Sequence, residues 1–117
     1  MRNKVLPGLA RHMKPVTIEH ATLKPGITAE AISESKIVIS KDVPKDSELY
    51  KRAIAHEGHH AKEMASGRIA SGDSFVRDGD QVFARGGGKI QQGSVWKMEG
   101  SKDFPWERRA IKAEEDV

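Results

Sequence analysis

The chain contains no cysteine among its 117 residues. This absence excludes disulfide bonds, zinc sites built from thiolates and enzymes with a cysteine nucleophile. Cysteine usage is also the main sequence clue to an oxidising compartment, so the composition leaves the compartment open.

Aromatic residues are scarce, with two Trp, three Phe and one Tyr, and 37% of residues are hydrophobic against 32% charged. This composition is polar for a globular chain but less extreme than that of disordered segments. The length fits one compact domain with a modest core. We therefore expect a single domain over residues 1–117, for which a bound metal is one source of the stability that the core lacks.

No block of five or six like charges occurs, and the formal net charge of +3 is spread along the chain. Arms that bind nucleic acid are usually denser in Lys and Arg, so no nucleic-acid partner is expected. No apolar run is long enough to span a membrane, and Pro7, Gly8 and Arg11 interrupt the pattern of a signal peptide. These absences predict synthesis as a soluble cytoplasmic protein with no membrane partner.

Short segments with strand patterns occupy the first third of the sequence. Residues 1–14 have too weak a period to distinguish a short helix from a loose arm. Residues 16–20 alternate apolar and polar side chains and predict a strand. Residues 28–33 fit either a helical turn or a strand, whereas the β-branched run Lys36–Ser40 is a better strand candidate.

A long helix is predicted from about Ser47 to Ser66. Asp46 or Ser47 can cap its start, Glu48 lies in its first turn, and Gly67 suits its end. Steps of three and four residues form one stripe on this helix, made of Leu49, Ala53, His56, Glu57, His60, Ala61 and Met64.

The C-terminal part of the sequence predicts shorter elements. Residues 75–83 read as a hairpin that turns at an Asp-Gly pair, and residues 86–88, all glycine, as a mobile loop near a cleft. Residues 95–96 predict a short strand, and residues 106–115 a last helix. We expect both tryptophans, Trp96 and Trp106, to anchor the core. The expected fold is α+β, a small twisted antiparallel or mixed sheet beside the long helix, closed by the C-terminal helix.

The segment His56-Glu57-Gly58-His59-His60 satisfies the pattern H-E-x-x-H. Positions i and i+4 of a helix lie on one face, so the imidazoles of His56 and His60 can reach one zinc ion. Glu57 would project beside them and take a proton from zinc-bound water as a general base. The alternative interpretation is a polar seam of histidines without a metal.

Two other residues of the motif have less certain roles. His59 can approach the same face as His56, as a hydrogen-bond donor behind the ligands or as an alternative ligand, but we expect it to face solvent. Gly58 is costly in a helix interior and would be explained by close packing of another backbone.

A catalytic zinc site needs a third protein ligand and one open position. Glu107 is the best candidate, because it lies among Trp106, Ala110 and Ile111, where an unpaired carboxylate is costly. Glu114, further along the same side, is the second candidate. The alternative for Glu107 is an exposed first-turn glutamate favoured by the helix dipole.

The HEGHH helix, followed much later by Trp106–Ala110, resembles a compact gluzincin, the zinc peptidase group with two His and one Glu as ligands. The segment from Glu107 to Ala110 matches the E-x-x-A setting of the third ligand in several such families. The resemblance implies that Lys36–Ser40 is the edge strand that binds substrate. The small residue common before the second motif histidine is replaced by His59. The size is similar to short metallopeptidases encoded by bacteria and tailed phages.

The function that this sequence predicts is a zinc-dependent peptidase with a peptide or protein substrate. One alternative is a non-catalytic, zinc-stabilised binding module or pseudo-peptidase, and another is a basic binding module whose histidines are incidental. The oligomeric state stays open. No residue stands out for stabilising the tetrahedral intermediate. The candidates are His12, His20 and Arg85, whereas Tyr50 is more than one turn from His56 and is expected to point poorly.

Overall fold

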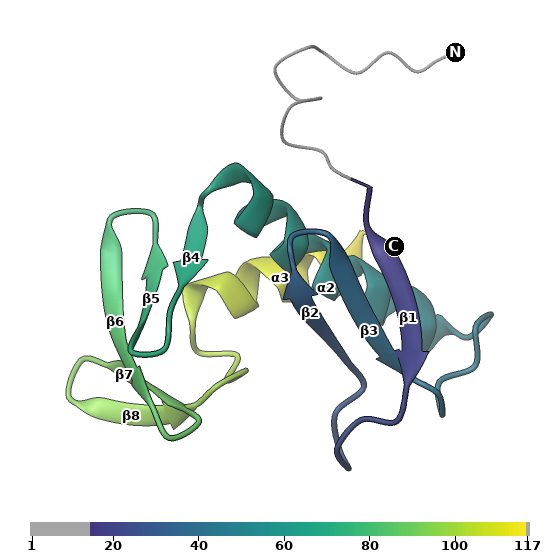
Figure 1. The fold of residues 1–117 in the computed structure, drawn as a ribbon, viewed down its shortest axis with the longest axis horizontal. Coiled ribbons are helices and arrows are strands. Elements are labelled where there is room, and N and C mark those ends of the chain that lie inside the picture. Colours follow the sequence, from purple (N-terminus) through teal and green to yellow (C-terminus); the bar gives the residue numbers. More distant parts are fainter. Residues whose placement is uncertain (1–14, 117) are drawn as a thin grey trace.

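The computed structural model of the protein describes residues 15–116 and has an α+β architecture (Figure 1). The predictions for residues 1–14, including His12, lie outside this range. The elements before the second sheet are β1 (Thr17–Ala21), β2 (Ala29–Ser33), β3 (Lys36–Ser40) and α2 (Glu48–Ser66). Those that follow are β4 (Ile69–Ser71), β5 (Phe75–Asp78), β6 (Gln81–Gly86), β7 (Lys89–Gln92), β8 (Val95–Met98) and α3 (Pro105–Glu115).

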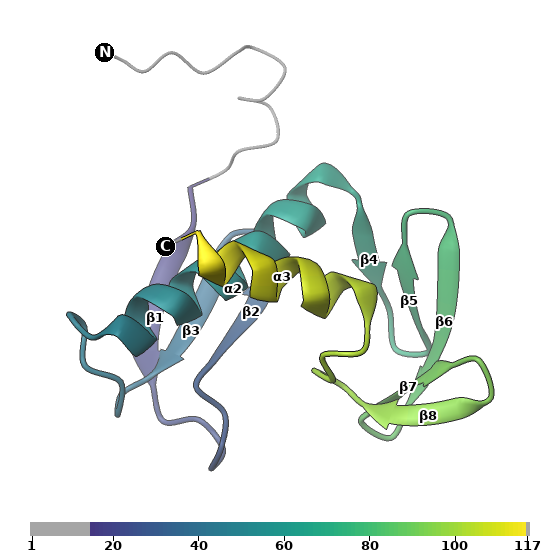
Figure 2. The ribbon, with the colours of Figure 1, turned by 180° about the vertical axis from the view of Figure 1, so that it is seen from behind.

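The first sheet has the order β1-β3-β2, with β1 parallel and β2 antiparallel to β3. Helix α2 covers one face of it, where Ile37, Ile39 and Val43 form a small core (Figures 1 and 2). The prediction that β3 is an edge strand was wrong. Its run of apolar residues is buried because strands flank it on both sides, and the edge strand beside α2 is β2.

Helix α2 begins and ends where its local signals predict. The Ser47 side chain accepts a hydrogen bond from the Tyr50 amide at 3.1 Å, and Gly67 ends the helix with a φ of 82°. Gly58 has no neighbouring atom within 4 Å of the position that a Cβ would take. Close packing of another backbone against Gly58, which the sequence suggested, is therefore wrong.

The second sheet is an antiparallel meander of β4, β5, β6, β7 and β8. The predicted hairpin joins β5 to β6, but the predicted mobile loop at residues 86–88 is instead the tight turn from β6 to β7. Gly87 and Gly88 have φ values of 59° and 76°, which suit the two central positions of a hairpin turn. Trp96 lies on β8 and is 45% exposed, so its predicted core role was wrong.

A second core joins this sheet to the start of α3. The rings of Phe104 and Trp106 stack with centroids 4.8 Å apart, and Phe83 meets Trp106 edge-on at 5.1 Å. Val76 and Ile90 complete the cluster. Trp106 is thus the core anchor that the sequence predicted, and it fixes the first turn of α3.

Helices α2 and α3 pack against each other between the two sheets (Figure 2). Ala110 of α3 is fully buried, and a residue this small keeps the two helices close. The packing brings Glu107 and Glu114 of α3 beside the motif histidines of α2. Within residues 15–116, neither helix is long and apolar enough to cross a membrane.

Candidate metal centre

Both motif histidines converge on one carboxylate oxygen of α3. The Nε2 atoms of His56 and His60 lie 2.9 and 3.1 Å from Oε1 of Glu107, and all three side chains are largely buried. The candidate ligand atoms of these residues lie within 4.8 Å of one another. The structure therefore brings together the three residues that the sequence singled out as metal ligands.

The donor set suits a zinc ion, as does the spacing of Glu107 from each histidine. Zinc bonds of 2.0–2.1 Å in a tetrahedral site separate neighbouring ligand atoms by about 3.3 Å. The two separations from Glu107 are close to this value. Two imidazoles and one carboxylate form a ligand set typical of catalytic zinc, with a fourth position left for water or substrate.

Glu114 occupies a different place from the one considered for it as a ligand. Its Oε2 atom lies 2.5 Å from Nδ1 of His56, the ring nitrogen that faces away from Glu107. A carboxylate behind a histidine in this way fixes the tautomer and the orientation of the ring. The geometry thus favours Glu107 over Glu114 as the third ligand.

Charge pairing dominates the titration of the cluster. Burial by itself lowers the pKa of His56, but hydrogen bonds to Glu107 and Glu114 outweigh it and raise that pKa to about 9. Burial raises the pKa of Glu107, and the two histidines outweigh this and lower it to about 2. Without a metal, His56 is therefore protonated at neutral pH, and a proton and a metal ion compete for its Nε2 atom.

Glu57 is held by the edge strand of the first sheet. Its Oε1 atom accepts a hydrogen bond from the Ala31 amide of β2 at 2.9 Å. Burial raises the pKa of Glu57, and the nearby charges of His60 and His56 reverse this only in part. A carboxyl with a raised pKa exchanges protons closer to neutral pH. Ala31 could not be singled out from the sequence, because it contributes only a backbone amide.

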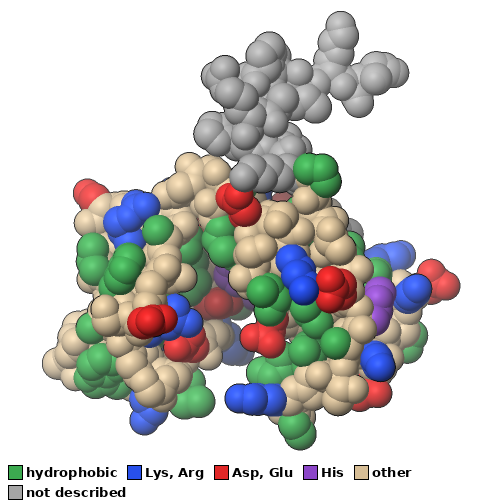
Figure 3. Space-filling model, viewed as in Figure 1, with side chains coloured by type: hydrophobic (Ala, Val, Ile, Leu, Met, Phe, Trp, Pro, Cys, Tyr) green, Lys and Arg blue, Asp and Glu red, His purple; other side chains and the backbone are tan. Residues whose placement is uncertain are grey.

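A cleft of about 840 Å³ opens at this cluster. Residues of β2 line one side, residues of the second sheet line the other, and the four motif and ligand side chains lie between them. Figure 3 shows the molecule hollowed between the two sheets, with acidic and histidine side chains visible inside. The candidate centre is therefore accessible to a ligand from solvent.

His59 lies beside the candidate ligands without joining them. Its Nε2 atom is 3.1 Å from Oε2 of Glu63, and about a quarter of its side chain is exposed. His59 is therefore only partly exposed, where full exposure was expected, because the buried carboxylate of Glu63 holds one edge of its ring.

The residues considered for stabilising a tetrahedral intermediate are engaged elsewhere. His20 and Tyr50 stack with centroids 5.9 Å apart, and neither lines the cleft. Arg85 does line it, but its guanidinium is paired with both carboxylate oxygens of Glu99 at 3.0 and 2.7 Å. The geometry assigns this task to none of the three.

Comparison of the chain with protein-family models, with curated proteins and with solved structures finds no match.

Proposed function

We propose that the protein is a zinc-dependent peptidase in which His56, His60 and Glu107 bind the ion and Glu57 is the general base. The observation that carries this proposal is the convergence of two Nε2 atoms on one Glu107 oxygen, in a cleft that also holds Glu57. Helical spacing alone accounts for the proximity of the two histidines. It does not account for the Glu107 carboxylate, which belongs to another helix and lies 47 residues after His60 in the sequence.

Zinc in this site would supply Lewis acidity, lowering the pKa of a coordinated water towards about 7 and polarising a peptide carbonyl. Glu57 accepts the proton of the attacking water and then transfers it to the departing amine. The Ala31 amide engages Oε1 of Glu57, and we assign the proton exchange to its other oxygen. Glu114 holds Nδ1 of His56, so that Nε2 is the nitrogen presented to the ion.

The proposed substrate is a peptide or protein segment in extended conformation. Strand β2 pairs with β3 on one side only, and its residues line the cleft beside Glu57. A sheet edge next to a reactive site can bind an extended segment through backbone hydrogen bonds. The resemblance to gluzincins implied that β3 binds the substrate, and this role would then belong to β2.

The decisive experiment compares Glu57→Gln with His60→Ala. Zinc content and cleavage of a mixture of unstructured synthetic peptides are measured, with products identified by mass spectrometry. Glutamine keeps an oxygen for the Ala31 amide but loses basicity, so zinc should stay while cleavage falls by about a hundredfold or more. His60→Ala should lose both zinc and cleavage. Glu48→Gln, on an exposed turn of the same helix, is the matched control and should resemble the parent.

Each alternative has its own outcome in this experiment. A parent protein that holds zinc but cleaves no peptide indicates a non-catalytic zinc-stabilised binding module or pseudo-peptidase. A parent protein without affinity for zinc contradicts the proposal and leaves a hydrogen-bonded cluster of His56, Glu107 and Glu114.

A further inference from the structure

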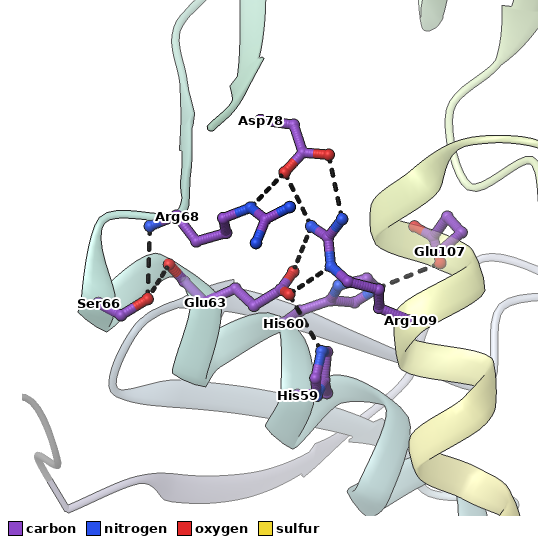
Figure 4. Close-up of polar contacts among 8 residues, drawn as sticks. All are labelled: His59, His60, Glu63, Ser66, Arg68, Asp78, Glu107 and Arg109. Carbon is purple, nitrogen blue, oxygen red and sulfur yellow. Dashed lines mark hydrogen bonds and ion pairs between the residues drawn. The ribbon is translucent and has the colours of Figure 1, made fainter. Parts of the chain in front are cut away.

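Two buried carboxylates share one arginine at the α2–α3 interface, apart from the candidate metal centre. Glu63 of α2 is 8% exposed and Asp78 at the end of β5 is 5% exposed. Arg109 of α3 pairs with Glu63 through Nε and Nη2 at 2.6 and 3.0 Å. It also pairs with Asp78 through Nη1 and Nη2 at 3.1 and 2.8 Å (Figure 4). One side chain of α3 is thus bound to the other helix and to the second sheet.

This network is continuous with the candidate metal centre along α2. His56, His60 and Glu63 stand at positions i, i+4 and i+7, which place all three on the side of α2 that meets α3. Each of the three contacts a side chain of α3. Glu63 thus follows the two candidate ligands on the side of α2 that meets α3.

On α3 the corresponding residues lie on either side of the helix contact. Glu107 contacts the two histidines, Arg109 contacts Glu63, and the fully buried Ala110 follows them. Residues two apart on a helix differ by about 200° in direction, so these two side chains hold α3 from two sides. Rotation or sliding of α3 that breaks one set of contacts would also break the other.

We infer that Arg109 is a positioning residue for the metal centre. It fixes the rotation and height of α3 against α2, so that Glu107 meets the Nε2 atoms of His56 and His60. Through Asp78 it also couples the second sheet to the same geometry. The inference rests on the proposed metal centre but concerns a residue that contacts none of the three ligands through a hydrogen bond or ion pair in residues 15–116.

A purely structural role for Arg109 makes a different prediction. Buried Glu63 and Asp78 each need a positive partner, and removing it is destabilising whatever happens at the metal. Arg68 provides a matched comparison, because its Nε atom also pairs with Asp78, at 3.0 Å, and its side chain is half-exposed. It belongs to the same network, yet the bonds it makes there do not reach α3. Arg108, exposed on α3, controls for loss of a positive charge from that helix.

The test measures zinc affinity by competition with a chelating dye, and the visible absorption of bound Co²⁺, which reports ligand geometry. Arg109→Gln, Arg68→Gln and Arg108→Gln are compared with the parent at a temperature where circular dichroism shows each metal-free protein folded. Loss of Arg109 should weaken zinc binding by about 10- to 100-fold and alter the Co²⁺ spectrum. Arg109→Lys should bind with intermediate affinity, because it keeps the charge without the two-pronged geometry. The two controls should bind within about twofold of the parent.

If Arg109→Gln does not fold, the double variant Glu63→Met with Arg109→Met replaces the pair by apolar side chains of similar length. Such replacements often preserve folding, and the double variant should show the same weakening of zinc binding. Parent-like affinity and an unchanged Co²⁺ spectrum, together with a lower melting temperature, would overturn the positioning role and leave the proposed metal centre intact. A parent protein that binds neither zinc nor Co²⁺ would overturn the proposed function itself.

Discussion

At the scale of single residues, His56 has a carboxylate on each ring nitrogen, with Glu107 at Nε2 and Glu114 at Nδ1. This arrangement raises its pKa to about 9. Imidazole must be neutral to bind a metal, so binding of the proposed zinc ion would require His56 to release this proton. The same carboxylates that build the site therefore set a cost on metal binding that depends on pH.

Zinc affinity should rise with pH by about tenfold per unit between pH 6.5 and 8.5, because one proton leaves His56 below its pKa of about 9. Calorimetry in buffers of different ionisation enthalpy should show release of about one proton per zinc or more at pH 7.5, one from His56 and a further fraction from the coordinated water. Glu114→Gln removes one of the contacts that raise this pKa and should release fewer protons than the parent. Glu115→Gln, an exposed neighbour on α3, is the control. Binding without proton release would contradict the assignment of His56.

The stability of the metal-free protein depends on pH in the opposite direction to zinc affinity, at least through His56. The raised pKa of His56 contributes stability that is fully present below about pH 6.5 and is lost as pH rises through about 9. The lowered pKa of Glu107 contributes stability that is present above about pH 4.5 and is lost as pH falls through about 2. His56 and Glu107 thus stabilise the metal-free fold most between about pH 4.5 and 6.5, and the proposed zinc ion should bind less tightly in this window than at higher pH.

At the scale of elements, the sequence predicted the helix boundaries better than the order of the strands in the sheets. Helix α2 followed from Ser47, Gly67 and the period of three to four residues, all of which act within one turn or one helix. The place of Lys36–Ser40 inside its sheet depends on which strands arrive beside it, and its own residues do not encode that. The turn at Gly87 and Gly88 was missed because three consecutive glycines suit a tight hairpin turn as well as a mobile loop.

The candidate site shows the same division. The motif and the apolar surroundings of Glu107 are readable within single helices, and the structure brings these residues together. The environment of His59 was not predicted, because it depends on Glu63, which is itself held by Arg109 from another helix. Contacts between elements that are distant in the sequence do not produce a periodic residue pattern in either element, so they could not be predicted.

The α2–α3 contact gives a prediction at this scale. Ala110→Leu places a larger side chain at a fully buried position. Overpacking of this kind costs about 1–3 kcal/mol of folding free energy. The helices should move apart, so zinc affinity should fall along with the free energy of unfolding measured in urea. Lys112→Leu, exposed on the same helix, makes a comparable change outside the interface. Parent-like zinc affinity in Ala110→Leu would show that the centre tolerates a wider helix spacing.

At the scale of the whole molecule, two small hydrophobic cores lie apart. One belongs to the first sheet and α2, and the other joins the second sheet to the start of α3. The candidate metal centre and the Arg109 network cross the helix interface between them. A ligand that binds only this assembled state stabilises the whole fold.

Zinc at a hundredfold excess over its Kd should therefore add about 2.7 kcal/mol to the free energy of unfolding, and a chelator should lower the melting temperature accordingly. The measurement is thermal unfolding followed by circular dichroism, with and without the chelator. His60→Ala is the control and should respond to neither zinc nor chelator. An identical melting temperature for the zinc-loaded and chelated parent would contradict a metal that bridges the two helices.

The separation of the ligands along the chain has a consequence for biosynthesis. Glu107 is 47 residues beyond His60, and the segment between them forms the whole second sheet. A ribosome that has delivered α2 has exposed two imidazoles and Glu57, but it still carries the third ligand and Arg109 in unfinished sequence. The proposed zinc centre thus closes only after translation has passed α3. Under the proposed function, cleavage by a nascent chain would therefore require that Glu107 and Arg109 have left the ribosome.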